Sequence, residues 1–254
     1  MTSSPRVGLF VTCLVDLVRP QVGFAAVKLL EAAGCTVEVP AAQTCCGQPA
    51  WNAGADTHAA DIARQVVDAF EPFDYVVAPS GSCAGMIKLH YVEALAADAA
   101  YAPRARALAQ KTFELVAFLV RVREFQGIAA HCKATACYHD SCSSLREMGV
   151  HDEPRQLLKS VGGLVLRDLH DPKVCCGFGG LFSVKYPEIS ERMADDKISD
   201  AEKSGAELLI GGDLGCLLHL EGRLARQAKT IRARHVAEIL AGMNDGPAPG
   251  EADS

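Results

Sequence analysis

The chain lacks the features that place a protein in a membrane or direct it out of the cell. The first apolar run, residues 7–18, contains Asp16 and is too short to cross a bilayer. The N-terminal residues lack the small-residue cleavage site of a secretory signal peptide. No other stretch approaches the length of a transmembrane helix. We therefore expect a cytoplasmic protein without a transmembrane segment.

Positive charge and aromatic residues are also scarce. Lys and Arg number 25 against 31 Asp and Glu, which gives a net charge of −6. Nucleic-acid-binding domains carry clustered basic residues, so we do not expect a nucleic acid as a partner. Aromatic residues make up 6% of the chain, but 49% of all residues are hydrophobic. That content suffices for a folded core and excludes an intrinsically disordered chain.

Cysteine, by contrast, is abundant and patterned. The chain has 11 cysteines, and two adjacent pairs are each followed by glycine. Each pair has a lone cysteine before it and another after it, with nearly the same spacing in both cases. The two matched sets are Cys13, Cys45, Cys46 and Cys83, and Cys142, Cys175, Cys176 and Cys216. A period of about 130 residues indicates a duplicated domain rather than a solenoid.

Short apolar segments alternate with segments of helical periodicity, which is typical of α/β proteins with parallel sheets. Strands are predicted at residues 7–13, 36–39, 75–78, 133–138, 164–166 and 207–210. Helices are predicted at residues 20–33, 57–70, 113–122, 153–160, 189–203 and 235–240, with a helical insert at 86–110. We therefore predict two pseudo-repeated α/β halves with parallel sheets, each carrying one cysteine set. The predicted divisions are 1–127 for the first repeat, 128–243 for the second, and 244–254 for a disordered tail.

The cysteines of each set follow predicted strands, although they lie far apart in the sequence. Because the carboxyl ends of parallel strands meet at one edge of a sheet, we expect each set to gather there. In a reducing cytosol, patterned cysteines are metal ligands or redox thiols rather than disulfides. Thiolates favour iron–sulfur clusters and zinc, and a set of four suits a [4Fe–4S] cluster or a zinc ion. All eight cysteines are therefore predicted to bind metal.

Several other residues lie near the predicted sites. His139, three residues before Cys142, is either a ligand, a hydrogen-bond donor to a ligand, or a structural histidine. The glycines after each pair, together with Gly81 and Gly85, either let the backbone approach a bulky cluster or form turns. The three remaining cysteines have no counterpart in the other half. Of these, Cys35 and Cys137 are predicted to be packing residues, and Cys132 is either packed or exposed.

These runs of residues resemble the cysteine-rich (CCG) domain family, which includes a subunit of heterodisulfide reductase and the iron–sulfur subunit of glycolate oxidase. The resemblance extends from Val7 to Leu240 and is strongest to the lactate-utilization members of the family. It rests on the segments Leu9–Asp16, Cys45–Ala50, Pro79–Cys83, Cys175–Gly180, Phe182–Lys185 and Gly205–Gly211.

The resemblance implies an iron–sulfur component of a complex that oxidises L-lactate to pyruvate. Such a component acts with other lactate-utilization iron–sulfur proteins and carries no flavin of its own. In the family, the last cysteine often belongs to a Cys-x-x-Cys pair, whereas Ser80 and Asp213 occupy the earlier position here. A [4Fe–4S] cubane, a cluster with an open iron, or zinc at one site all remain compatible with this difference. Asp213 is predicted to be a turn residue or an oxygen ligand.

Two other functions stay open, namely one component of a thiol–disulfide reductase, by analogy with the heterodisulfide enzymes, and a zinc-binding scaffold protein. The sequence identifies no catalytic acid or base.

The two cysteine sets also differ, because Gln48-Pro49 follows the first pair and Gly179-Gly180 lies just after the second. Glycine leaves open space, proline stiffens the backbone, and a catalytic metal site keeps an open position. We therefore predict that the second set is the more reactive one.

Overall fold

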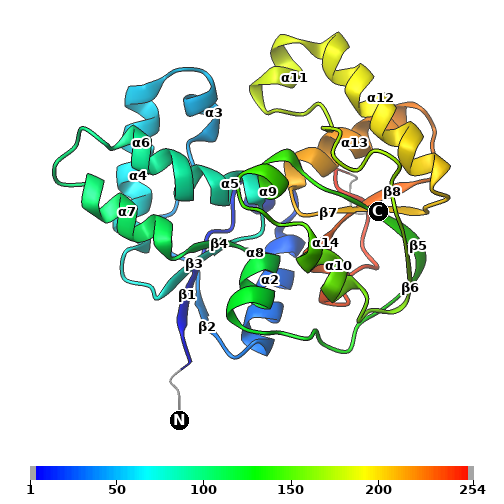
Figure 1. Ribbon diagram of the computed structural model, residues 1–254, viewed down its shortest axis with the longest axis horizontal. Coiled ribbons are helices and arrows are strands. Elements are labelled where there is room, and N and C mark those ends of the chain that lie inside the picture. The colour runs from blue at the N-terminus through cyan, green and yellow to red at the C-terminus, as the bar shows by residue number, and fades with distance from the viewer. Residues whose placement is uncertain (1–3, 251–254) are drawn as a thin grey trace.

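The computed structural model describes residues 4–250 and shows two α/β halves within one molecule (Figure 1). The first half contains a parallel four-stranded sheet in the order β2-β1-β3-β4. Its strands are β1 (Arg6–Leu9), β2 (Thr36–Glu38), β3 (Tyr75–Ala78) and β4 (Thr112–Glu114).

The second half repeats this arrangement with the order β6-β5-β7-β8, again parallel throughout. Its strands are β5 (His131–His139), β6 (Gly162–Arg167), β7 (Leu208–Gly211) and β8 (Arg232–His235). When β5 is matched to β1 and the others follow in sequence, the two strand orders are identical. The predicted fold of two α/β halves with parallel sheets is therefore confirmed.

Helices connect the strands and cover both faces of each sheet. In the first half they are α1 (Cys13–Val18), α2 (Pro20–Ala32), α3 (Gln48–Asn52), α4 (Asp56–Phe70), α5 (Gly81–Gly85), η1 (Met86–His90), α6 (Tyr91–Ala94), α7 (Ala102–Gln110), α8 (Leu115–Ala117) and η2 (Phe118–Val122). In the second half they are α9 (Cys142–Arg146), α10 (Asp152–Leu158), α11 (Leu181–Lys185), α12 (Pro187–Lys203), α13 (Leu214–Arg226) and α14 (Val236–Leu240).

Helix α2 illustrates why such segments are helical. Pro20 occupies the first turn, where its missing N–H would have no partner in any case. Val22 and Leu29 lie on one buried face at helical spacing. Gly34 follows the end with a φ of 79°, the left-handed conformation that commonly terminates a helix.

Three elements illustrate where the structure differs from the sequence prediction. Strand β4 occupies the start of the predicted helix 113–122, and its only large apolar residue is Phe113. Strand β8 was not predicted, because Arg232 and Arg234 alternate with its buried residues. Helix α13 was not predicted either. A Cβ on its Gly215 would lie 2.5 Å from the ring of Phe178, so packing favours the glycine there.

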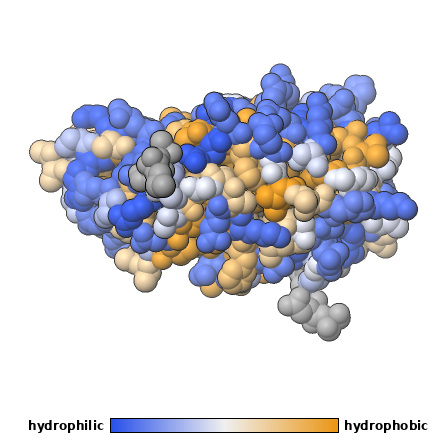
Figure 2. Space-filling model, turned by 90° about the horizontal axis from the view of Figure 1, so that it is seen from below, coloured by the Kyte–Doolittle hydropathy of each residue, from blue (hydrophilic) through white to orange (hydrophobic). Residues whose placement is uncertain are grey.

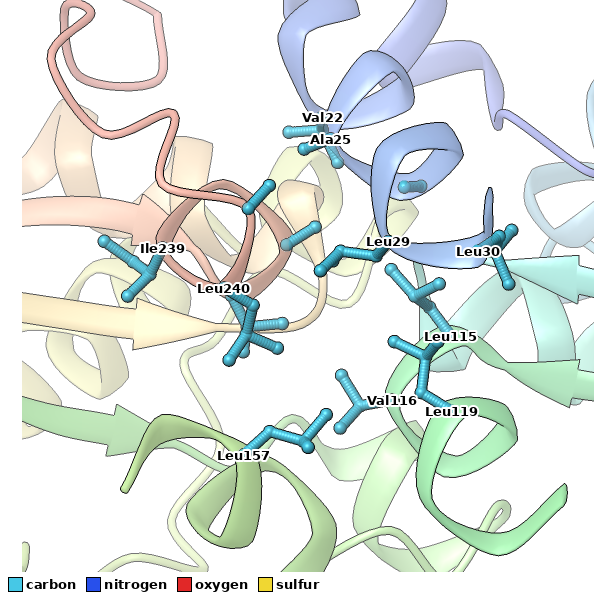
Figure 3. Packing of buried hydrophobic residues seen from close by; sticks show 14 of the residues in the cluster. Val22, Ala25, Leu29, Leu30, Leu115, Val116, Leu119, Leu157, Ile239 and Leu240 are labelled. Carbon is cyan, nitrogen blue, oxygen red and sulfur yellow. The ribbon is translucent and has the colours of Figure 1, made fainter. Parts of the chain in front are cut away.

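One hydrophobic core joins the two halves (Figure 3). Leu29 of α2 lies near Leu240 of α14, so the second helix of the chain packs against the last one. Val116 of α8 and Leu157 of α10 close the other side of this core. Full burial of a leucine side chain contributes about 1.5–3 kcal/mol to folding. The inner faces of both sheets therefore depend on residues of the other half.

Polar contacts reinforce this shared core. Arg19 and Glu238 form a buried ion pair, with 2.8 Å between Nη2 and Oε1. Lys28 Nζ donates a hydrogen bond of 2.7 Å to the carbonyl of Ala241. Because the core crosses the predicted division at residues 127 and 128, that division remains a prediction from the sequence.

Two further clusters fill the outer faces of the sheets. One lies around Phe70 in the first half, and the other lies around Leu220 in the second. The molecular face in Figure 2 is mixed, with hydrophobic residues lying between hydrophilic ones. Within residues 4–250, no helix combines the length and the apolar character needed to cross a membrane.

The predicted tail at 244–254 is only partly described. Residues 251–254 lie outside the described part of the chain. Arg234 Nη2 donates a hydrogen bond of 2.8 Å to the carbonyl of Gly246, and Ala248 is buried. The predicted disorder of this segment remains a prediction.

Candidate metal centres at the carboxyl edges of the sheets

Each cysteine set gathers at the carboxyl edge of its own sheet. In the first half, Cys13 begins α1 just after β1, and Cys83 lies in α5 just after β3. Strands β1 and β3 are neighbours, and the chain leaves them toward opposite edges of the sheet. Open α/β sheets form their binding crevices at such a switch point. The second half places Cys142 after β5 and Cys216 after β7 in the same way.

The structure brings the first set together as the sequence predicts. The sulfur atoms of Cys13 and Cys45 are 3.8 Å apart, and those of Cys46 and Cys83 are 3.3 Å apart. The Gly47 amide donates to Cys45 Sγ over 3.5 Å. A buried tyrosine that the sequence did not reveal, Tyr91, donates its hydroxyl to the Cys46 carbonyl over 2.8 Å. The hydrogen bond from Tyr91 therefore helps to hold the loop that carries Cys45 and Cys46 in place.

The thiols of the first set affect one another's ionisation. A hydrogen bond from the Cys13 thiol lowers the pKa of Cys45 to about 2. The same contact raises the pKa of Cys13 above the ordinary thiol value, and contact with Cys45 raises the pKa of Cys46. One thiolate thus lies beside neighbours that stay protonated. A bound metal cation would let those neighbours ionise too, because metal-ligating thiols are deprotonated.

The second set repeats this pattern. A hydrogen bond from Cys142 lowers the pKa of Cys175 to about 2, and the same contact raises the pKa of Cys142. Contact with Cys175 raises the pKa of Cys176. The pKa of Cys216 falls to about 7, mainly through the hydrogen bond from Cys176. Backbone amides also point at the sulfurs, since Gly177 N lies 3.4 Å from Cys175 Sγ.

His139 distinguishes the second set from the first. Its side chain is 1% exposed, and in the described part of the chain neither ring nitrogen has a hydrogen-bond partner. Potential ligand atoms of His139, Cys176 and Cys216 all lie within 4.8 Å of one another. This is the one residue near the predicted sites for which the sequence left three interpretations open. The structure places it against the cysteines.

The glycine after each pair has a conformational reason. Gly47 has a φ of 83° and Gly177 a φ of 87°, in the left-handed region that favours glycine. A Cβ on Gly177 would lie 2.5 Å from the carbonyl oxygen of Ser190 in α12. The loop that carries each cysteine pair therefore turns sharply against the helix that follows it.

Gly81 and Gly85 lie where the two halves meet. A Cβ on Gly81 would lie 2.7 Å from Ser144 Cα, and one on Gly85 would lie 2.3 Å from Glu147 Oε2. These glycines let α5 of the first half approach α9 of the second. The sequence did not reveal this contact between the halves.

Asp213 connects the two halves between the cysteine sets, a role that the sequence did not reveal. Its carboxylate is buried, and Oδ1 accepts from Ser80 Oγ at 2.6 Å and from Ser82 N and Oγ at 3.0 and 2.8 Å. Oδ2 accepts from the hydroxyls of Ser141 and Ser144, the latter at 3.1 Å. Burial alone would raise the pKa of Asp213, but these hydrogen bonds outweigh it and lower that pKa.

Two of these residues are counterparts in the duplicated halves. Ser80 lies three residues before Cys83, and Asp213 lies three residues before Cys216, so they occupy the positions where the family often has another cysteine. The two side chains hydrogen-bond to each other across the molecule. Ser80 and Asp213 therefore form a contact that fixes the two sets relative to each other.

The three cysteines without counterparts are buried in hydrophobic cores. Cys137 is fully buried in the outer core of the second half, and Cys35 and Cys132 are buried in the shared core. The predicted packing role of Cys35 and Cys137 is confirmed, and Cys132 is packed rather than exposed. All 11 cysteines lie within the described residues and carry free thiols.

The donor sets fit a thiolate-bound metal. Soft sulfur atoms gather in each half, and the buried imidazole of His139, without a hydrogen-bond partner among the described residues, lies beside the second set. Thiolate sulfur suits iron–sulfur clusters and zinc, and imidazole suits both iron and zinc. The residues therefore fit an iron–sulfur cluster in either half, or zinc in one of them.

Comparisons with known proteins agree with the duplicated pattern. A family model described as a cysteine-rich domain (CCG) matches residues 7–88 and 136–221, so each match contains one complete cysteine set. The chain is 49% identical over 239 residues to lactate utilization protein A from Geobacillus kaustophilus, covering 94% of this chain and all of that relative. It is 47% identical over 235 residues to the protein of the same name from Shouchella clausii, covering 92% and 98%.

A solved structure shares the fold over nearly the whole chain. The crystal structure of a hypothetical protein from Helicobacter pylori matches 97% of this chain with a TM-score of 0.66 and 11% sequence identity. The chain spans about half of that protein, 52% of its length. At this level of identity the similarity supports the fold alone.

Proposed function

The chain belongs to the cysteine-rich (CCG) domain family, and on this premise we propose that it is the iron–sulfur component of an oxidoreductase that converts L-lactate to pyruvate. The observation that supports this most directly is the pair of gathered cysteine sets, in which sulfur atoms from distant parts of the sequence lie close together. The name of relatives that are 47–49% identical over almost their entire length points to lactate as the substrate.

The overall reaction removes two electrons and two protons from each lactate molecule. A thiolate-bound iron–sulfur cluster supplies one-electron transfer. The run Gly177–Gly180 does not match the glycine fingerprint of dinucleotide-binding proteins. We therefore assign this chain to electron transfer in a cytoplasmic complex with other lactate-utilization iron–sulfur proteins.

The residues of this chain hold and shield the two centres. Cys46 and Cys176 are almost completely buried, so one wall of each centre excludes water. Cys13 and Cys142 are half-buried, which leaves one side of each centre accessible to a partner. Backbone amides next to the paired cysteines donate toward sulfur, and such hydrogen bonds help to set the potential of a cluster.

Metal analysis of anaerobically purified protein tests the proposal. We expect iron and acid-labile sulfide, a brown colour, and bleaching of the visible absorbance when L-lactate is added together with the partner proteins. D-lactate is the matched control for substrate specificity. Protein that contains neither iron nor sulfide after anaerobic reconstitution would contradict the proposal.

A second candidate function is thiol–disulfide exchange, and the 3.3 Å separation of Cys46 and Cys83 sulfurs favours it. In that reaction, two thiols lose two electrons and two protons and form one disulfide, while a substrate disulfide is reduced to two thiols. Stoichiometric reduction of a disulfide by the metal-free protein would support this candidate. Zinc in place of iron, without either activity, would support the scaffold function.

A further inference from the structure

His139 is a buried polar residue without a partner. It is the last residue of β5, and it is 1% exposed. In the described part of the chain neither Nδ1 nor Nε2 has a hydrogen-bond partner. Buried polar side-chain atoms nearly always have such a partner, and the exceptions require an explanation.

The atoms nearest to this imidazole suggest what the partner is. One ring nitrogen lies within 4.8 Å of both Cys176 Sγ and Cys216 Sγ, and those two sulfurs lie within the same distance of each other. The imidazole therefore lies close enough to both sulfurs to share a metal centre with them after small side-chain movements. Coordination would also satisfy one of the two ring nitrogens.

The first half has a hydrocarbon side chain at the position that matches His139. Phe10 lies three residues before Cys13, as His139 lies three residues before Cys142. Phe10 is fully buried and packs on Phe70, with 5.4 Å between the ring centroids. An aromatic hydrocarbon therefore fits this place in the fold, so packing alone does not require an imidazole in the second half.

We propose that His139 is a metal ligand of the second centre, in addition to its cysteines. The inference rests on the proposed function, because it assumes that the cysteine sets bind metal. The first centre is then ligated by sulfur alone, whereas the second has mixed sulfur and nitrogen ligation. A neutral imidazole carries no negative charge, whereas a thiolate ligand at the same place would lower the reduction potential of a cluster.

Pulsed electron paramagnetic resonance of the second centre tests this directly. The full chain carries Cys45→Ser and Cys46→Ser in every sample, so that the signal arises from the second centre, and is loaded anaerobically with ferrous iron and sulfide. With His139 present we expect strong hyperfine coupling to a ¹⁴N nucleus, which changes to the ¹⁵N pattern in protein grown on ¹⁵N-histidine. In His139→Phe, which installs the residue of the first half, we expect this coupling to be lost.

A second variant covers the case in which His139→Phe loads poorly. His139→Cys supplies a sulfur ligand at the same place. We expect it to hold iron and sulfide at the level of the parent, to show no nitrogen coupling, and to have a lower midpoint potential in a redox titration. Absence of histidine-nitrogen coupling in the parent, or its persistence in His139→Phe, would overturn the inference.

Cobalt separates this inference from the proposed function. If the parent takes up no iron and sulfide, the iron–sulfur assignment fails, but Co²⁺ added to the same metal-free protein still reports the ligands. Histidine-nitrogen coupling to bound Co²⁺ that is lost in His139→Phe would support His139 as a ligand. Co²⁺ bound through sulfur alone, or no binding of Co²⁺ by the parent, would overturn it.

Discussion

The two halves of the molecule share one topology, but the residues around their cysteines differ. Where the first half has Phe10, the second has His139, and where the first has Ser80, the second has Asp213. The strand orders are the same, and the cysteines follow the same strands in both halves. Duplication therefore preserved the frame that gathers four thiols, and a few substitutions beside it made the two centres chemically different.

The contact between the halves uses that difference. An aspartate in both halves would place two buried carboxylates side by side, and like charges so close are destabilising. Ser80 instead donates a hydrogen bond to Asp213 over 2.6 Å. The asymmetry at this pair is therefore a requirement of the interface as well as a difference between the centres.

The largest expected effect comes from replacing one cysteine in each pair, which compares the two centres directly. Cys176→Ser removes a ligand from the centre predicted to be more reactive, and we expect lactate-dependent activity to fall by at least about 100-fold, since even outer residues of metal sites cost about 10–100-fold. Cys46→Ser should mainly lower the iron content or the stability. Activity and iron are measured on the same samples. An inactive Cys46→Ser protein with full metal content, together with an active Cys176→Ser protein, would reverse the assignment.

Removing the carboxylate of Asp213 should destabilise the contact between the halves. Asp213→Ala leaves four serine hydroxyls without their shared acceptor, and we expect a loss of about 4 kcal/mol in the free energy of unfolding. Asp213→Asn is the matched control, because it keeps one acceptor oxygen and should lose about half as much. Urea unfolding of the metal-free proteins measures both. Equal losses in the two variants would show that charge, and not the number of acceptors, is what matters here.

Glu114 and His235 end matching strands and cap matching helices, but they should give stability opposite dependences on pH. Burial raises the pKa of Glu114 to about 7 from 4.5. The folded state then binds more protons than the unfolded state between these values, so the free energy of unfolding falls as pH rises, by about 3 kcal/mol in all. Burial lowers the pKa of His235. That group therefore makes stability rise with pH up to its unfolded value of 6.5.

Two variants separate these contributions in chemical denaturation measured from about pH 4.5 to 8, a range that spans both unfolded pKa values. Glu114→Gln keeps an oxygen for the amide of Ala117 and should remove the falling contribution. His235→Asn keeps an acceptor for the amide of Ala237 and should remove the rising one. A wild-type pH profile that neither variant alters would contradict the assigned directions of both pKa shifts.

The glycines after the cysteine pairs should differ slightly in their tolerance of alanine. Both have positive φ, which costs alanine about 1 kcal/mol. At Gly47 the added methyl would meet a flexible side chain, Ile62, at 3.2 Å, whereas at Gly177 it would meet a backbone oxygen at 2.5 Å. We therefore expect Gly177→Ala to be about 1–2 kcal/mol less stable than Gly47→Ala. Gly205→Ala, with φ of 73° and open space, controls for the backbone effect alone.

The frame of each half could be predicted from the sequence because its signals are local. Residues 75–78 form a continuous apolar run and are strand β3 as predicted, and residues 20–33 combine Pro20, helical spacing and Gly34. Strands β4 and β8 could not be found in this way. Their residues follow no apolar alternation strong enough to outweigh the polar side chains of Thr112, Glu114, Arg232 and Arg234.

The gathering of each cysteine set was also predictable, since it follows from strand ends meeting at one edge of a parallel sheet. The surroundings of the sets were not. Asp213 accepts a hydrogen bond from Ser80, which lies 133 positions away in the sequence. No local sequence pattern indicates such a pairing. His139 was noticed through its spacing from Cys142, but only the fold shows that both its nitrogens lack partners among the described residues. Metal binding by the eight cysteines remains a prediction.

The packing of α2 against α14 has a consequence for synthesis on the ribosome. The apolar face of α2 emerges before the second half does, whereas α14, which covers it, follows β8 and ends at Leu240. Until then the inner face of the first half lacks its native cover. Such contacts between distant segments slow folding, and transiently exposed apolar surface promotes aggregation. The nascent first half should therefore depend on chaperones until α14 docks.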